Sequence, residues 1–119
     1  MELIKQTSSA QAVSDELTTL LDWTNIEALS GFTLIVENTG GGSGQNITDV
    51  QIDTSSDGGL TSQLDQFSSL FAAAIAPGTA LRGTSITSAK WIRVRAVCAA
   101  SQDTTANAWL MADSTLGRI

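Results

Sequence analysis

The side chains of this 119-residue chain that could perform chemistry are mostly carboxylates and hydroxyls, because it contains no histidine and no tyrosine. Histidine is the commonest general acid–base, and a serine or cysteine nucleophile needs such a base beside it. A carboxylate pair such as Asp49 and Asp53 could act as in glycosidases. Two acids on the outer face of a strand are, however, most often solvated. We therefore predict that the protein is not an enzyme.

One acidic segment matches the opening of a calcium-binding loop. Asp53, Ser55 and Asp57 would supply oxygen ligands at positions 1, 3 and 5, and Gly58 follows at position 6. Position 12, which should be a bidentate glutamate, is Leu64. The first three residues are candidate metal ligands, and a turn rich in Ser, Asp and Gly is the alternative. No cofactor is expected.

A second pattern lies on the predicted strand around residues 91–98, where residue types alternate. Its inner face carries Ile92, Val94, Ala96 and Cys98, the only cysteine, which we expect to be a buried small hydrophobe. Its outer face carries Trp91, Arg93 and Arg95. Because interfaces favour aromatic and arginine side chains, these three residues predict an interface. The alternative is that both arginines pair with acids on neighbouring strands.

The elements that would position these residues are strands. Strand-like runs recur about every ten residues between clusters of Gly, Ser, Thr, Asn and Asp, which predicts an antiparallel β-sandwich, jelly-roll-like, of about seven or eight strands. Three segments are ambiguous. Residues 17–29 favour a strand with a bend near Asn25 or a short helix, residues 60–69 a helical turn or a crossing loop, and residues 71–75 a helix or a strand.

One domain is expected, because the length suits a single core. Residues 17–119 would form the sandwich, and the polar residues 1–16 would be an N-terminal arm that orders on docking or an edge strand. The N-terminus shows no basic start followed by an apolar stretch, so no secretion signal is expected. No apolar run is long enough to cross a bilayer, so no membrane partner is expected and synthesis should be cytoplasmic.

The net charge of −6 argues against DNA or RNA as a partner, because nucleic-acid binding depends on cationic side chains. The charge is also unevenly distributed. Residues 1–60 hold one base against nine acids, and residues 61–119 hold five bases against three acids. An acidic patch of one subunit could therefore meet a basic patch of another, unless folding interleaves the two halves.

Five segments between residues 31 and 112 carry a resemblance to a known family: FTLIVENTGGG (32–42), ITDVQIDTSSDGG (47–59), APGTA (76–80), KWIRVRAV (90–97) and AWLMAD (108–113). In style they resemble the small β-sandwich virion proteins of tailed bacteriophages, especially head decoration or cement proteins. The resemblance implies a homo-oligomer, often a trimer, that binds the major capsid protein on the outside of the head. It would stabilise the shell by non-covalent clamping.

The alternative function is a carbohydrate-binding module or a receptor-binding tail component. A β-sandwich can present an aromatic platform to sugars, and the available indoles are those of Trp23, Trp91 and Trp109.

Overall fold

The computed structural model describes residues 2–26, 31–67, 70–71, 73–86 and 89–112. This part of the chain is all-β, with eight strands and no helix, and so no helix that could cross a membrane. The strands are β1 (Glu2–Gln6), β2 (Gln11–Val13), β3 (Thr18–Asn25), β4 (Gly31–Asn38), β5 (Ile47–Ser55), β6 (Ala80–Ile86), β7 (Trp91–Cys98) and β8 (Thr104–Ala112).

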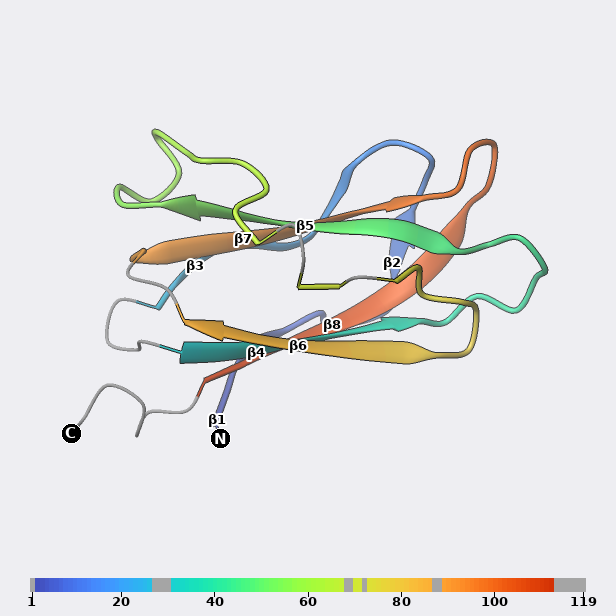
Figure 1. Ribbon diagram of the computed structural model, residues 1–119, viewed down its shortest axis with the longest axis horizontal. Helices are drawn as coiled ribbons and strands as arrows, with labels where there is room; N and C mark the ends of the chain where they lie inside the picture. Colours follow the sequence, from blue (N-terminus) through green and yellow to red (C-terminus); the bar gives the residue numbers. More distant parts are fainter. Residues whose placement is uncertain (1, 27–30, 68–69, 72, 87–88, 113–119) are drawn as a thin grey trace.

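The strands form two antiparallel sheets that pack face to face (Figure 1). Sheet A has the order β1-β8-β4-β6, with β2 also paired to β8, and sheet B has the order β3-β7-β5. From β2 onward, each strand lies in the opposite sheet from the one before it. Alternation of successive strands between two antiparallel sheets is the arrangement of a jelly roll, so the predicted fold class is confirmed.

The polar N-terminal segment contributes two strands to one edge of sheet A. β1 pairs with β8 from Glu2↔Ala112 to Gln6↔Trp109, and β2 pairs with the beginning of β8 from Gln11↔Ala106 to Val13↔Thr104. Val13 is buried in the core. Residues 2–6 and 11–13 are thus edge strands of the sandwich in this structure.

The core lies between the sheets and follows from alternation along each strand. β7 shows this most clearly, since Ile92, Val94, Ala96 and Cys98 are buried while the residues between them are partly exposed, as predicted. The other sheet contributes mainly from β4 and β8. Its fully buried apolar side chains include Phe32, Leu34, Val36, Ala106, Ala108 and Leu110.

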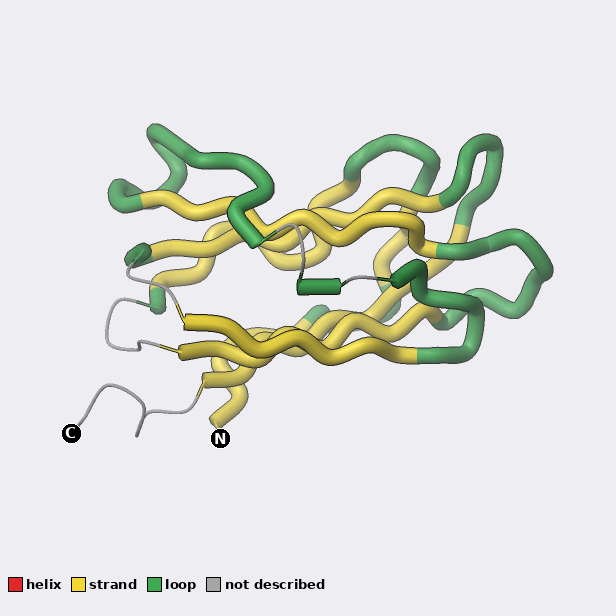
Figure 2. The backbone as a smooth tube through the Cα atoms, in the orientation of Figure 1, coloured by secondary structure: helices red, strands yellow, loops and turns green. Residues whose placement is uncertain are grey.

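The three segments that were ambiguous in sequence contain no described helix. Of residues 17–29, Thr18–Asn25 form β3, and residues 27–29 lie outside the described part. The chain between β5 and β6 crosses irregularly from sheet B to sheet A (Figure 2). It follows the outer edge of β5 through isolated bridges from Gln63 to Thr54 and from Ile75 to Ile47. Between them, the ring of Phe67 packs edge-on against Phe32 at 5.3 Å.

Asn38, at the end of β4, is a fully buried amide whose hydrogen bonds join three separate segments. Its Nδ2 donates to the carbonyl oxygens of Gln45 (2.7 Å) and Ile75 (2.9 Å). Its Oδ1 accepts from the Gly40 N–H (3.0 Å) and the Thr104 hydroxyl (2.6 Å). One side chain therefore holds the glycine-rich loop, the crossing segment and the start of β8 together.

We predict that Asn38→Ala lowers the free energy of unfolding by about 3 kcal/mol, because several buried polar groups lose their partners at once. The measurement is urea unfolding followed by tryptophan fluorescence. The matched control is Asn107→Ala, whose side chain accepts one hydrogen bond, from Thr7. It should cost less than about 1 kcal/mol. Equal losses for the two variants would contradict the role assigned to Asn38.

Candidate functional site

Among the described residues, the carboxylate of Asp53 on β5 is an acid that is fully buried. Val50 and Ile52 belong to the core, and Asp53 points to the outer face of sheet B, yet it is fully buried. The expectation of a solvated acid is therefore wrong for Asp53. The reason is tertiary, because residues 56–66, here called the covering loop, fold back over this face (Figure 2).

Two arginines from β7 hold this carboxylate, in a group that we call the Asp53 clamp. Arg93 donates from Nε to Oδ2 at 2.8 Å, and its Nη2 lies 2.7 Å from the same oxygen. Arg95 donates from Nη2 to Oδ1 at 3.1 Å. Its Nε lies 2.7 Å from Oδ2 as an ion pair, without the alignment of a hydrogen bond. The register of β5 on β7 sets this arrangement, because Asp53 lies directly opposite Arg93.

The surroundings of the clamp come from all three strands of sheet B and from the covering loop. The Arg93 guanidinium lies over the ring of Trp23, 4.8 Å from its centroid, which is a favourable cation–π geometry. Arg95 also donates to Gln51 Oε1 at 3.3 Å, and Gln51 in turn donates to Asp49. The arginine side chains are 23% and 17% exposed, so the cluster is sheltered from water.

The pKa of Asp53 reflects opposing causes. Burial raises this pKa, but hydrogen bonds from Arg95, from the backbone N–H of Asp65 and from Arg93 together outweigh it and hold the pKa below its ordinary value. Asp53 is therefore ionised at neutral pH and its two oxygens are engaged. A carboxylate in this state is a poor general acid and has no free oxygen to act as a nucleophile or base. The clamp is a structural ion-pair group.

Asp65 of the covering loop has the opposite electrostatic character. Burial, followed by the negative charges of Asp49 and Asp53, raises the pKa of Asp65. Its Oδ1 is buried and has no hydrogen-bond partner among the described residues. Its backbone N–H donates to Asp53 Oδ1 at 3.0 Å, and its φ of 52° lies in the left-handed region. The backbone N–H of Asp65 thus stabilises the clamp, while its ionised side chain destabilises the folded state.

The oxygen atoms of the candidate calcium ligands are engaged in contacts with other protein groups. The Asp53 carboxylate forms ion pairs with Arg93 and Arg95. Ser55 Oγ lies 2.8 Å from Asp57 Oδ1 and accepts from the Gly59 N–H at 2.9 Å. Asp57 accepts from both the backbone N–H and the hydroxyl of Thr61, and these bonds lower the pKa of Asp57 to about 2. The segment is a hydrogen-bonded turn, and the described residues hold no cluster of acids, Cys or His suited to a metal.

The predicted interface residues lie on one face of β7, as their alternation indicated. Arg93 and Arg95 pair with an acid on the neighbouring strand, which is the alternative that the sequence left open. Trp91 is half-buried beside Gly58 of the covering loop. The pairing joins two bases of the C-terminal half to an acid of the N-terminal half, so folding interleaves the charges here.

The three indoles differ in what they contact. Trp23 is covered by Arg93 on one side and closely approached by Gly59. Trp91 faces Gly58. Trp109 is half-buried on β8, where it lies opposite Ile35 of β4. Trp23 and Trp91 are therefore both half-buried and both lie beside the glycines of the covering loop.

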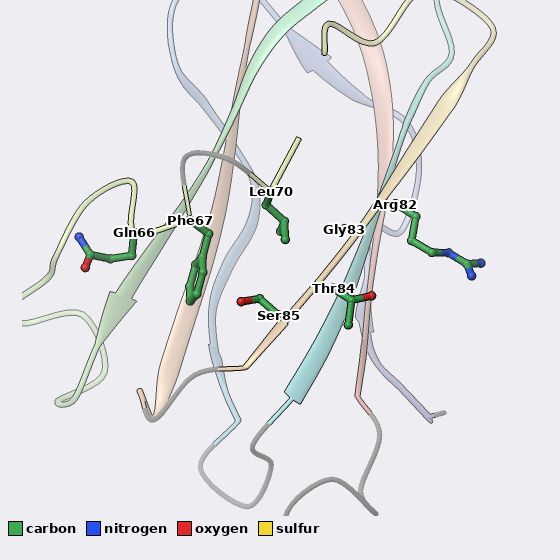
Figure 3. Close-up of a pocket in the computed structure, with 7 residues that line it drawn as sticks. All are labelled: Gln66, Phe67, Leu70, Arg82, Gly83, Thr84 and Ser85. Carbon is green, nitrogen blue, oxygen red and sulfur yellow. The ribbon is translucent and has the colours of Figure 1, made fainter. Parts of the chain in front are cut away.

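A groove of about 510 Å³ runs along the outer edge of sheet A, and sequence reasoning did not find it (Figure 3). We call it the β6 groove. Phe67 and Leu70 of the crossing segment form one side and β6 forms the other, with Arg82 and Thr84 turned away from the hollow (Figure 3). The residues that line it are Gln66, Phe67, Leu70, Arg82, Gly83, Thr84 and Ser85.

No protein-family model and no curated protein matches the chain. One similar solved structure comes from work on Bacillus endospore appendages, which are described as a novel family of disulfide-linked pili. The two chains are 11% identical, with 91% of this chain and 85% of the other covered and a TM-score of 0.43. A likeness at this level assigns neither a family nor a function.

We predict that Asp53→Asn lowers the free energy of unfolding at pH 7 by about 3 kcal/mol, because two sheltered arginines lose their counter-charge. Since the folded pKa of Asp53 is lowered, its contribution is present above its unfolded pKa of about 4 and is lost as the pH falls below it. This loss is complete only below the folded pKa, so urea unfolding should show a large difference between wild type and variant at pH 7 and a smaller difference at pH 3.

The matched control for this test is Asp49→Asn, because Asp49 is half-buried on the same strand and accepts one side-chain hydrogen bond, from Gln51. It should change stability by less than about 1 kcal/mol. An Asp53→Asn protein as stable as wild type at pH 7 would show that the clamp is not structural.

Asp65→Asn should have the opposite sign and raise stability at pH 7. The raised pKa means that the ionised side chain destabilises the fold, increasingly so as the pH rises through that pKa. Asparagine tolerates the left-handed backbone, so the substitution removes the charge without strain. Thermal unfolding at pH 7 measures the gain, and Asp103→Asn, at an exposed acid, is the control. A lower melting temperature than wild type would refute this assignment.

Proposed function

We propose that the protein is a structural virion protein, a decoration or cement protein that stabilises a phage head by non-covalent clamping of major capsid subunits. It would act as a homo-oligomer, with a trimer favoured, on the outside of the capsid after synthesis in the host cytoplasm. The resemblance of its segments to head decoration proteins names this class. The observation that supports a binding role is the exposed apolar end of the covering loop.

Leu60 and Leu64 expose 89% and 53% of their surface, more than the other large apolar side chains of the described chain. Both belong to the covering loop, and Leu60 follows the Gly58-Gly59 turn. A single exposed leucine is ordinary. A pair on one short loop offers an apolar contact that a partner subunit can bury, and apolar contacts of this kind supply affinity at interfaces.

The loop that carries these leucines is held in a fixed shape. Ser55 Oγ, buried at its base, donates to the Thr61 carbonyl oxygen at 2.6 Å and accepts from the Gly59 N–H. Gly59 approaches the indole of Trp23 so closely that a Cβ there would collide with the ring. A preorganised loop loses little conformational entropy on binding, which favours affinity.

The side chains that could do chemistry support a non-catalytic role. The oxygens of Asp53, Ser55 and Asp57 are engaged in internal bonds. Burial raises the pKa of the Cys98 thiol and keeps it in its unreactive form. Arg93 and Arg95 would contribute to binding indirectly, by supporting the covering loop, and Trp91 would lie at the margin of the contact.

The test is co-expression with the major capsid protein encoded by the same genome, followed by gradient sedimentation of assembled heads. We expect the wild-type chain to sediment with heads and to raise their temperature of disruption. Leu60→Ser/Leu64→Ser should reduce occupancy at least tenfold, because two apolar contacts worth about 1 kcal/mol or more each are removed.

Leu3→Ser is the control, since Leu3 is also exposed, at 47%, but lies on β1 of the other sheet. Both variants should unfold at the wild-type urea concentration, because the substituted side chains are exposed. Heads that assemble and resist heating identically with and without the chain would refute the decoration role. A shift of tryptophan emission on a glycan array would favour the sugar-binding alternative in its place.

A further inference from the structure

The four edges of the two sheets are protected to very different degrees. β1 has a register shift between Leu3 and Lys5, and β2 is only three residues long. β3 has two register shifts along β7. The outer edge of β5 is bridged by Gln63 and Ile75. Short strands, bulges and covering segments are the usual means by which proteins prevent an edge from pairing with another chain.

Within the described residues, β6 has none of these protections. It pairs with β4 over seven consecutive residues, from Gly31↔Ile86 to Glu37↔Ala80, without a register shift. It contains no proline, and no strand of the described chain pairs with its outer side. A regular, uncovered edge of this length is a template for an additional strand.

The backbone groups that β6 directs outward can be assigned from the end of its ladder with β4. The Asn38 N–H donates to the carbonyl oxygen of Thr79 (2.9 Å), and the Asn38 C=O accepts from the N–H of Gly78 (2.8 Å). Gly78 and Thr79 directly precede β6, so both backbone groups of Asn38 face the side on which β6 lies. Because these groups alternate along an antiparallel strand, Val36 and Leu34 also face β6. Their partners Leu81 and Gly83 therefore face β4, and the N–H and C=O of Arg82 and Thr84 face the open edge.

The β6 groove lies where the side chains of an added strand would go. Such a strand would lie about 4.8 Å from β6, and every second side chain would point into the sandwich. At this place the described structure offers Phe67 and Leu70 as an apolar wall, and Leu70 packs so closely on Gly83 of β6 that a Cβ there would collide with it. The remaining side chains of an added strand would share the outer face with Arg82, the one charged residue of the lining.

The charge of Arg82 distinguishes between the protein segments that could pair with the open edge of β6. In a two-fold pairing of β6 with a second copy centred on residue 82 or 83, Arg82 would lie opposite or diagonal to its own copy on the same face, which is unfavourable. An extended segment with a carboxylate beside Arg82 would instead form an ion pair.

We propose that the β6 edge binds an extended segment of a partner protein by strand addition. That segment has apolar side chains at alternate positions facing Phe67 and Leu70, and an acidic side chain beside Arg82. This inference rests on the proposed function for the class of partner, a protein subunit of the particle, and gives the clamping a second contact besides the covering loop.

The test is NMR titration of the full chain with capped probe peptides of about seven residues that alternate valine and threonine around a central glutamate. We expect shifts in the amide signals of Arg82 and Thr84 and in the side-chain signals of Phe67 and Leu70. The same peptide with lysine at the centre should bind about threefold more weakly. This difference should disappear in Arg82→Gln. A peptide with N-methyl groups on its pairing side should not bind.

Thr84→Pro removes an outward N–H, so it should weaken binding at least tenfold, whereas Thr84→Ala keeps this group and should bind nearly as wild type. If the proline variant does not fold, the N-methylated peptide gives the same test on the wild-type chain. Shifts confined to residues outside both β6 and the β6 groove, equal binding of the N-methylated peptide, or a dimer that buries β6 in the free protein would each overturn the proposal.

These experiments use no capsid, so they are independent of the decoration role. Peptide binding together with undecorated heads would refute the proposed function and leave the strand-addition site intact.

Discussion

The ion pairing of Asp53 with Arg93 and Arg95 is the interaction on which the outer face of sheet B depends. A buried carboxylate is tolerated only when its charge is matched and its oxygens are hydrogen-bonded. Both arginines come from the adjacent strand, and the remaining donor is the backbone of Asp65. The covering loop must therefore close over the carboxylate for the site to be complete. That closure fixes the position of Leu60 and Leu64 and the start of the crossing segment.

The crossing segment links this cluster to the opposite edge of the molecule. Its bridges to β5 protect one sheet edge, and Phe67 and Leu70 then pass to the side of β6. Asn38 holds the other end of the segment through Ile75. The backbone of this irregular segment bonds to β5 at Gln63 and Ile75 and so covers the edge of β5. Its side chains Phe67 and Leu70 lie beside β6 and line the groove there. The segment does not pair with β6, so the edge of β6 stays open.

Patterns of period two made the sandwich and the two faces of β7 predictable from sequence, because alternation is a local property. The burial of Asp53 was not predictable in this way. It arises from a loop that returns over the strand, and nothing in the sequence near Asp53 reports that return. The pairing of Arg93 and Arg95 with an acid was foreseen as an alternative, but its partner depends on the register between β5 and β7.

The open edge of β6 also escaped prediction, since an edge is defined by the strand order of the whole sheet. The sequence of β6, ALRGTSI, contains a glycine, small polar residues, one charge and no proline. These features are compatible with an open edge but do not by themselves predict one. Leu60 is recognisable in the sequence as an isolated apolar residue among polar ones. Its exposure, however, follows from the turn that Ser55 and Asp57 stabilise.

The central claim is that this chain works by binding capsid subunits through its covering loop and its β6 edge. An electron cryo-microscopy reconstruction of decorated heads tests this claim most directly. The account predicts density for the sandwich at contacts between capsid subunits, with Leu60 and Leu64 against one subunit and an extended capsid segment paired along β6. Heads without bound density, or with both surfaces facing solvent, would contradict it.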